Sequence, residues 1–211
     1  MRREHIVVAF YGYPGSGKGT QANLVANAFG LANFDTGRML EMIWYDPSRQ
    51  TDPLVVKERA IFEKGELNTP SFVLGEVERM TRTLSDQGAG IVYSGSPRTM
   101  FEAEGLIPVL EQLYGKDRMF FFHLDVDPSD SIARNGKRLL CKECKTPVLM
   151  QYYPVETPKY CPVCAGELYR RTLDDPNTIP NRLKEYEART WPIIDFLKAR
   201  GYDVPKVDGR P

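Results

Sequence analysis

The stretch "IVVAFYGYPGSGKGT" (residues 6–20) decides the fold. Its first six residues form a near-continuous apolar run, which is typical of a parallel strand buried on both faces. The next nine residues contain four glycines, and glycine permits the left-handed backbone angles that turn successive N–H groups towards an anion. A helical pattern begins at residue 18, so the amides of its first turn face the same anion. The stretch therefore predicts a strand, an anion-binding loop and a helix, in that order.

Residues 12–20, here called the P-loop, fit the pattern G-x-x-x-x-G-K from Gly12 to Lys18. In this pattern the lysine reaches the β- and γ-phosphates of a nucleotide. Ser or Thr usually follows the lysine directly, whereas here Gly19 precedes Thr20. The alternative is a glycine-rich turn that holds no ligand. The strand before the loop and the helix after it favour nucleotide binding.

The composition favours a soluble domain and argues against two classes of partner. The 211 residues are 42% hydrophobic and 27% charged, and Lys+Arg and Asp+Glu both number 28. The chain therefore lacks the overall positive charge of a nucleic-acid-binding protein. It contains no run of about 18 apolar residues that could span a membrane, and its N-terminus lacks the pattern of a secretory signal. We expect a cytoplasmic protein.

Strand-like and helix-like segments alternate along the chain. Further apolar runs occur at 90–94 and 119–126, and helical periodicity is predicted over 18–29, 37–45, 53–64, 71–87, 100–114 and 177–201. This alternation predicts an α/β fold of three layers with a parallel sheet. Residues 139–170 carry all four cysteines and no helical period, which indicates a separate small insertion.

The four cysteines form the pattern C-x2-C-x16-C-x2-C, with Cys141, Cys144, Cys161 and Cys164 as its members. Two such pairs at this separation are typical of a zinc site. Four thiolates leave no open coordination position, so a bound zinc ion would be structural. The alternatives are disulfides or a redox pair, and nothing in the sequence suggests the secretion that disulfides usually accompany.

The chain resembles adenylate kinases and related nucleoside monophosphate kinases. The resemblance rests on "GYPGSGKGT" in full and continues in order through "DTGRML" (35–40), "KGELNT" (64–69), "SGSPRT" (94–99), "RNGKRLLCKEC" (134–144), "CPVC" (161–164), "GELYRR" (166–171) and "NRL" (181–183). It implies a P-loop NTPase fold with a small helical domain for the monophosphate and a zinc-binding lid. The expected division is a core of 1–35, 89–133 and 175–211, a monophosphate-binding region of 36–75 and a lid of 134–174.

The resemblance also implies the activity. Such a kinase transfers the γ-phosphoryl group of ATP·Mg²⁺ to a nucleoside monophosphate, with AMP as the default acceptor. The implied cofactors and partners are ATP, Mg²⁺, structural Zn²⁺ and small-molecule nucleotides, and the implied oligomeric state is a monomer. Two alternatives stay open: a kinase shifted to another monophosphate such as GMP, and a weakly active ATP-binding protein.

The matched motifs imply the site residues. The residues expected to be catalytic are Lys18, Arg98, Arg134, Arg138, Arg171 and Arg182. The residues expected to bind ATP are Gly15, Ser16, Gly17, Lys18, Gly19, Thr20, Arg138 and Arg210. The residues expected to bind the monophosphate are Thr36, Arg38, Glu66, Leu67, Asn68, Gly95, Arg98, Glu102, Arg171 and Arg182. Arginine suits these roles because its guanidinium is always charged and can hold a phosphate with two hydrogen bonds.

Several positions depart from the family pattern, most of them in the acceptor half. Arg38 and Glu41 exchange the usual order of acid and arginine, and Ser94 replaces an aspartate that holds water on the magnesium. Glu102 stands where a glutamine usually faces the acceptor base. An ionised carboxylate can only accept hydrogen bonds, so this exchange predicts weaker use of AMP and better use of GMP. The alternative is that Glu102 turns to solvent on its helix.

Overall fold

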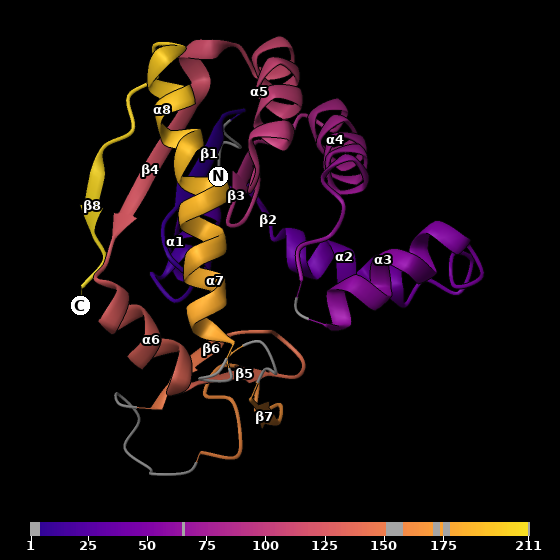
Figure 1. Ribbon diagram of the computed structural model, residues 1–211, viewed down its shortest axis with the longest axis vertical. Helices are drawn as coiled ribbons and strands as arrows, with labels where there is room; N and C mark the ends of the chain where they lie inside the picture. The colour runs from indigo at the N-terminus through magenta and orange to yellow at the C-terminus, as the bar shows by residue number, and fades with distance from the viewer. Residues whose placement is uncertain (1–4, 65, 151–157, 171–173, 175–177, 211) are drawn as a thin grey trace.

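The computed structural model describes residues 5–64, 66–150, 158–170, 174 and 178–210 (Figure 1). A parallel sheet with helices packed on it forms the body of the molecule. Helices α2 (Thr36–Trp44) and α3 (Pro53–Glu63) project from one side of this body, and a second, small sheet lies beyond the far ends of α6 (Pro128–Gly136) and α7 (Ile179–Glu185). None of the described helices is long and apolar enough to cross a membrane.

The main sheet has the strand order β2-β3-β1-β4-β8, and all its neighbouring strands are parallel. Its strands are β1 (Val7–Tyr11), β2 (Ala32–Phe34), β3 (Ile91–Tyr93), β4 (Met119–Asp125) and β8 (Lys206–Asp208). All five residues of β1 are buried. In the register, Ala9 lies opposite Tyr93 on one side and Phe121 on the other. The central position of β1 explains its continuous hydrophobicity.

Some of the described helices cover the two faces of the sheet, and others, such as α2 and α3, project from it. The described helices are α1 (Lys18–Phe29), α2 (Thr36–Trp44), α3 (Pro53–Glu63), α4 (Pro70–Asp86), α5 (Met100–Tyr114), α6 (Pro128–Gly136), α7 (Ile179–Glu185) and α8 (Trp191–Ala199), with a 3₁₀ turn, η1 (Lys116–Arg118), before β4. Val8 and Phe10 share one core cluster with α1, while Val7, Ala9 and Tyr11 share the other with α5 and α8. Successive side chains of a strand point to opposite faces, so this split confirms the three-layer α/β fold.

The helices and strands expected from periodicity agree with the structure to within one or two residues. The short strands β2 and β8, the helix α6 and the three short strands between residues 138 and 169 were not predicted. The helix expected over 177–201 is interrupted by a π-helical segment, η4 (Tyr186–Thr190). Pro192 explains the break, because it has no N–H to donate to the carbonyl of residue 188 and its ring crowds that carbonyl.

The small sheet is antiparallel and has the order β6-β5-β7. Its strands are β5 (Arg138–Cys141), β6 (Pro147–Leu149) and β7 (Leu168–Tyr169). Leu139 lies opposite Val148, and Cys141 lies opposite Leu168. The sheet is inserted between α6 and α7, as expected for a lid.

Helix α5 begins with a capping box that fixes the loop before it. The Thr99 hydroxyl accepts a hydrogen bond from the Glu102 N–H and donates one to the Glu102 carboxylate. The other carboxylate oxygen of Glu102 accepts from the Arg98 N–H at 2.9 Å. The Glu102 N–H is one of the amides that the first helical turn leaves without partners, and the Arg98 N–H is an amide of the loop before the helix. The loop after β3 is thereby attached to α5.

Candidate functional site

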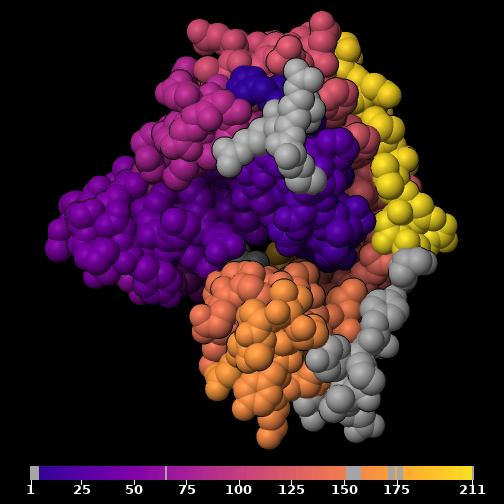
Figure 2. Space-filling model, turned by 180° about the vertical axis from the view of Figure 1, so that it is seen from behind, coloured from indigo at the N-terminus to yellow at the C-terminus, as the bar shows by residue number. Residues whose placement is uncertain are grey.

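A cleft of about 1160 Å³ lies at the carboxyl ends of β1 and β3. These strands are neighbours in the sheet, so the P-loop after β1 and residues 94–98 after β3 come together at one edge. Residues of α2, α7 and β6 complete the walls. Figure 2 shows the opening between the small sheet and the rest of the molecule. In a parallel α/β sheet this edge is where ligands bind.

Glycines let the P-loop pass close to α6. Gly15 has φ 83°, and a Cβ atom added to it would lie 2.4 Å from the side-chain nitrogen of Asn135. Gly17, with φ 99°, is the N-cap of α1, so Lys18 begins the helix. Residues 15 and 17–20 line the cleft, whereas Ser16 is buried and its hydroxyl has no hydrogen-bond partner among the described residues. A loop of this shape presents amides rather than side chains to a ligand.

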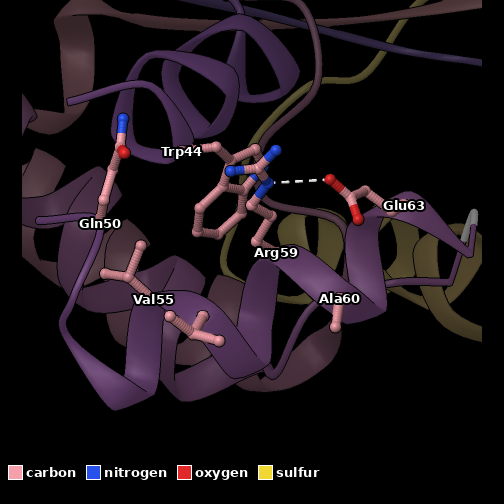
Figure 3. A pocket seen from close by; sticks show the side chains of 7 residues that line it. Trp44, Gln50, Val55, Arg59, Ala60 and Glu63 are labelled. Atoms are coloured by element: carbon pink, nitrogen blue, oxygen red, sulfur yellow. Dashed lines mark hydrogen bonds and ion pairs between the residues drawn. The ribbon is translucent and has the colours of Figure 1, made fainter. Parts of the chain in front are cut away.

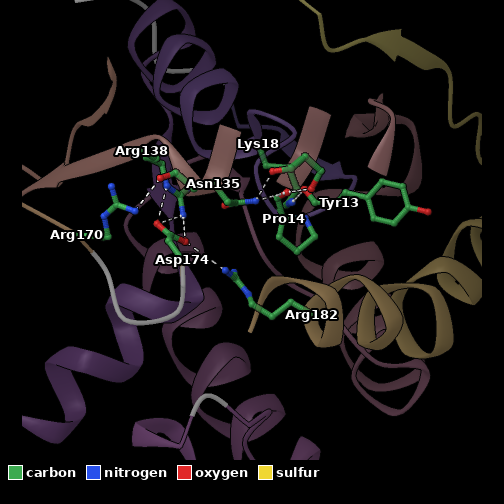
Figure 4. A network of polar contacts seen from close by, with 10 residues as sticks. Tyr13, Pro14, Lys18, Asn135, Arg138, Arg170, Asp174 and Arg182 are labelled. Carbon is green, nitrogen blue, oxygen red and sulfur yellow. Dashed lines mark hydrogen bonds and ion pairs between the residues drawn. The ribbon is translucent and has the colours of Figure 1, made fainter. Parts of the chain in front are cut away.

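Lys18 folds back onto its own loop. Its Nζ donates to the carbonyls of Gly12 at 2.7 Å and Tyr13 at 2.8 Å (Figure 4). Burial, together with the positive charge of Arg98, lowers the pKa of Lys18 to about 7. A lysine in this state gains a proton when an anion approaches, because the anion favours the charged form.

Helix α6 is hydrogen-bonded to the P-loop, a contact that sequence reasoning missed. The Asn135 side chain donates to the carbonyl of Pro14 at 2.8 Å, and the Ser131 hydroxyl donates to the same carbonyl. Ser131 and Asn135 are one helical turn apart, so they face the same way. The sequence "SIARN" (131–135) gives no local signal for this contact, because the contact depends on how α6 packs against the P-loop.

Four of the five expected arginines line the cleft: Arg98, Arg134, Arg138 and Arg182. The fifth, Arg171, lies outside the described residues. Arg134 donates to the carbonyl of Gly209 at 2.8 Å, and Arg98 donates to that of Gly95 at 2.6 Å. These arginines come from different parts of the fold and meet around one cleft.

Asp174 joins two of these arginines and was not predicted. Its side chain is fully buried and receives two hydrogen bonds from Arg138 at 2.6 Å and 2.8 Å through Nη2, and a third at 3.0 Å through Nε. Arg182 approaches the same carboxylate at 3.3 Å (Figure 4). The carboxylate therefore links β5 of the small sheet to α7 of the core.

The π-helical segment η4 contacts both loops of the cleft. The Thr190 hydroxyl donates to the carbonyl of Arg98 at 2.7 Å. The Tyr13 hydroxyl donates to the Glu187 carboxylate at 2.7 Å, and the Tyr13 ring packs on Tyr186. Such segments occur often at functional sites. Here η4 connects the P-loop with the loop after β3.

The other half of the cleft contains most of the residues expected to bind a monophosphate. Those lining it are Thr36, Glu66, Leu67, Asn68, Gly95, Arg98 and Glu102, and Ser94 lies there as well. The hydroxyls of Thr36 and Ser96 form a buried hydrogen bond of 2.6 Å. Arg38 is exposed and does not line the cleft. Its backbone N–H donates to the side chain of Asp35, the N-cap of α2. Arg210 also stays outside, where it is paired with Asp208.

Glu102 lines the cleft and does not turn to solvent, so that alternative was wrong. The residue is only 4% exposed, and both its oxygens accept hydrogen bonds within the capping box. Burial raises the pKa of its carboxyl, while the bond from Arg98 opposes this effect. The carboxylate thus holds the arginine loop in place, a role that the sequence comparison with glutamine did not reveal.

The four cysteines gather at one end of the small sheet. Their sulfur atoms all lie within 4.8 Å of one another, and all four thiols are free. The Cys141–Cys164 and Cys144–Cys161 sulfur distances are 3.4 Å and 3.6 Å. Zn–S bonds of about 2.3 Å place tetrahedral ligands about 3.8 Å apart. The arrangement therefore fits a metal ion held by four thiolates.

The two cysteine pairs lie in two separate turns that have the same backbone geometry. Lys145 and Ala165, which directly follow the second cysteine of each pair, have φ 59° and 58°. Such values are uncommon for residues other than glycine. In each turn an amide two residues after the first cysteine donates to its sulfur, from Glu143 and Val163. The repeated geometry directs two sulfur atoms from each pair to one point.

A smaller pocket of about 290 Å³ lies between α2 and α3. It is lined by Trp44, Gln50, Val55, Val56, Arg59, Ala60 and Glu63, and an Arg59–Glu63 ion pair crosses one end (Figure 3). None of the residues predicted for the site lines this pocket.

Comparison with known proteins gives one consistent result. The adenylate kinase family matches residues 10–202. The adenylate kinase of Bacillus subtilis (strain 168) is 32% identical over 200 residues, which cover 94% of this chain and 88% of the relative. That of Caldicellulosiruptor bescii is 34% identical over 191 residues, 90% of this chain and 86% of the relative. That of Pelobacter propionicus is 34% identical over 203 residues, 96% of this chain and 89% of the relative.

The state of Lys18 predicts how ATP affinity depends on pH. Because the pKa of Lys18 is lowered to about 7 in the ligand-free cleft, the side chain loses its proton above that pH, and binding a phosphate then requires proton uptake. We expect ATP affinity to fall by up to about tenfold per pH unit above pH 7. Titration calorimetry in two buffers of different ionisation enthalpy measures both the ATP affinity and the number of protons taken up on binding.

The matched control is Lys18→Arg, because a guanidinium stays charged throughout this range. The variant should bind ATP with little dependence on pH. Equal proton uptake by the native protein and the variant would contradict the assignment to Lys18.

Proposed function

The chain belongs to the adenylate kinase family and is an enzyme that catalyses ATP + AMP = 2 ADP, and we propose that the residues of the central cleft carry out this transfer as follows. The observation that carries the proposal is the meeting of the P-loop lysine with arginines from separate elements around one cleft. Phosphoryl transfer needs positioning and charge neutralisation more than a nucleophilic side chain.

The P-loop half of the cleft binds ATP. The amides of residues 15–20 and the first turn of α1 surround the phosphates, and Lys18 leaves the carbonyls of Gly12 and Tyr13 to neutralise them. When bound, Mg²⁺ would share this neutralisation, and the hydroxyls of Thr20 and Ser94, which line the cleft, would hold it or its water. The buried hydroxyl of Ser16, which has no partner among the described residues, fits a loop completed by its ligand.

The half formed by α2, residues 66–68 and the loop after β3 binds AMP. Arg98 grips its α-phosphate, and the capping box with Glu102 keeps that loop in place. Arg134 and Arg138 approach ATP from the base of the lid, and Arg182 lies between the two halves. Arg171 is proposed to act with Arg182. Arg38 and Arg210 lie outside the cleft, so we assign them no contact in this arrangement.

Asp174 positions Arg138 and Arg182 before nucleotide arrives. Two guanidiniums in one cleft repel each other, and the buried carboxylate between them offsets this repulsion. The same bonds tie the lid to the core. We propose the division into a core of 1–35, 89–133 and 175–211, an AMP-binding region of 36–75 and a lid of 134–174, in which the lid excludes water during transfer.

The four cysteines are proposed to hold one structural Zn²⁺ within the lid. The free thiols, the sulfur distances and the paired turns fit four thiolate ligands. We further propose that the enzyme acts as a monomer, because one chain supplies the described residues named for the transfer. A cytoplasmic location is proposed from the sequence.

The function itself is tested by ADP formation from ATP and each of AMP, GMP, CMP and UMP in a coupled assay. We expect AMP to be the preferred acceptor. A preference for GMP would revive the alternative raised by Glu102, and no transfer to any monophosphate would refute the proposal.

Asp174→Asn tests the positioning role. The amide keeps the shape but removes the charge that holds Arg138 and Arg182, so we expect kcat to fall by about 10- to 100-fold. The KM for ATP should stay the same or decrease, because the site becomes more positive. Steady-state kinetics measure kcat and the KM for ATP separately. Asp174→Glu, which keeps the charge, should recover part of kcat.

The control for Asp174→Asn is Asp203→Asn, which removes an exposed carboxylate outside the cleft. It should leave both constants unchanged. A kcat for Asp174→Asn close to that of the native enzyme would refute the role.

Zinc analysis tests the metal site. We expect about one zinc ion per chain, and a strong chelator should make residues 139–170 more susceptible to protease while ATP binding to the core persists. Cys161→Ser should lower the zinc content of the purified protein and make the same residues more susceptible to protease. Metal-free protein with an intact, protease-resistant lid would argue against the assignment.

A further inference from the structure

Helix α3 contains a buried carboxylate whose described partners are neutral. Glu58 is 0% exposed. One oxygen, Oε2, accepts hydrogen bonds from the side-chain amide of Asn68 and from the N–H of Thr69, both at 2.9 Å. The other, Oε1, has no partner among the described residues. Burying a charge without an opposite charge costs stability, so stability alone does not explain a glutamate here.

The carboxylate fixes the orientation of the Asn68 amide. The amide nitrogen donates to Glu58 twice, to its backbone carbonyl at 2.6 Å and to Oε2 at 2.9 Å. Both N–H groups are therefore used. The reversed amide would place its oxygen against two acceptors. Burial opposes ionisation of Glu58, but the bonds from Thr69 and Asn68 outweigh it and hold the pKa of Glu58 below its usual range, so the carboxylate stays an acceptor.

The remaining polar atom of Asn68 is its amide oxygen, and Asn68 lines the acceptor half of the cleft. The oxygen accepts no hydrogen bond that the described residues provide. The apolar side chains of Leu40 and Val73 line the same half and offer surfaces on which a base can pack. A ligand that carries an N–H group would satisfy the amide oxygen.

We propose that Asn68 recognises the exocyclic amino group of the acceptor base, and that Glu58 is a positioning residue that holds the amide in the orientation this recognition needs. The inference rests on the proposed function, since it concerns the acceptor of the same reaction. Adenine carries an amino group at C6, whereas hypoxanthine carries a carbonyl oxygen there. An oxygen facing the Asn68 oxygen would lose a hydrogen bond and add repulsion, so the pair should favour AMP over IMP.

The test compares kcat/KM for AMP and for IMP, with ATP saturating, in the native enzyme and in Asn68→Val. The native enzyme should prefer AMP, and its activity with AMP establishes the basic function independently. In Asn68→Val we expect this preference to fall by about tenfold, because one hydrogen bond and one repulsive contact are removed together. The change should come from KM for the acceptor, with kcat for AMP and KM for ATP unchanged.

The role of Glu58 is tested by Glu58→Leu, alone and combined with Asn68→Val. If Glu58 acts through Asn68, the single variant should reduce the AMP preference in part, and the double variant should match Asn68→Val. The control is Glu63→Gln on the same helix, which removes an exposed charge that contacts Arg59. This control should leave the preference unchanged.

The outcomes separate the possibilities. An unchanged AMP-to-IMP ratio in Asn68→Val refutes recognition by Asn68, and full additivity in the double variant refutes positioning by Glu58. If Asn68→Val does not fold, the same AMP-to-IMP ratio is measured in Asn68→Ala, which also removes the amide and adds no branched side chain. If the native enzyme shows no activity with AMP, the proposed function itself is overturned.

Discussion

Positive charges must be held together in the cleft before any nucleotide neutralises them, and the surrounding structure depends on how this is done. Lys18 rests on the carbonyls of its own loop, Arg98 on that of Gly95, and Arg138 shares a buried carboxylate with Arg182. Each of these side chains thus has an acceptor within the protein before a phosphate group arrives. The arrangement keeps the cleft cationic at a tolerable electrostatic cost.

The fold could largely be predicted because its central strand and its helices have clear periodicity. Burial of β1 on both faces produces a continuous apolar run, and α5 and α8 carry regular apolar stripes. The missed elements have weak local signals. Strand β8 is an exposed edge of three residues, and β2 contains Asn33 between two apolar residues; both are specified by their neighbours in the sheet rather than by their own composition.

The site could be predicted where a motif lies within one segment, and not where contacts join distant segments. The P-loop and the cysteine pairs have fixed local spacing, so their members were found by number. Asp174, Asn135 and Glu58 act on residues brought near by folding, and nothing in their immediate sequence announces this. Glu102 shows the reverse case: the position was recognised, but its hydrogen bonds to its own helix were not.

The π-helical segment between α7 and α8 has a consequence for the rotational phase of the last helix. An α-helix advances about 100° per residue, and a π turn accommodates roughly one extra residue without adding a turn. The apolar residues Ile193 and Leu197 therefore face the sheet although they belong to a different angular register from Leu183. Deleting one residue from 186–190 would rotate this apolar face by about 100° relative to α7 and turn it away from the core, while Pro192 would still interrupt the helical hydrogen bonds. The irregular segment is therefore what lets both halves of the helix meet their separate neighbours.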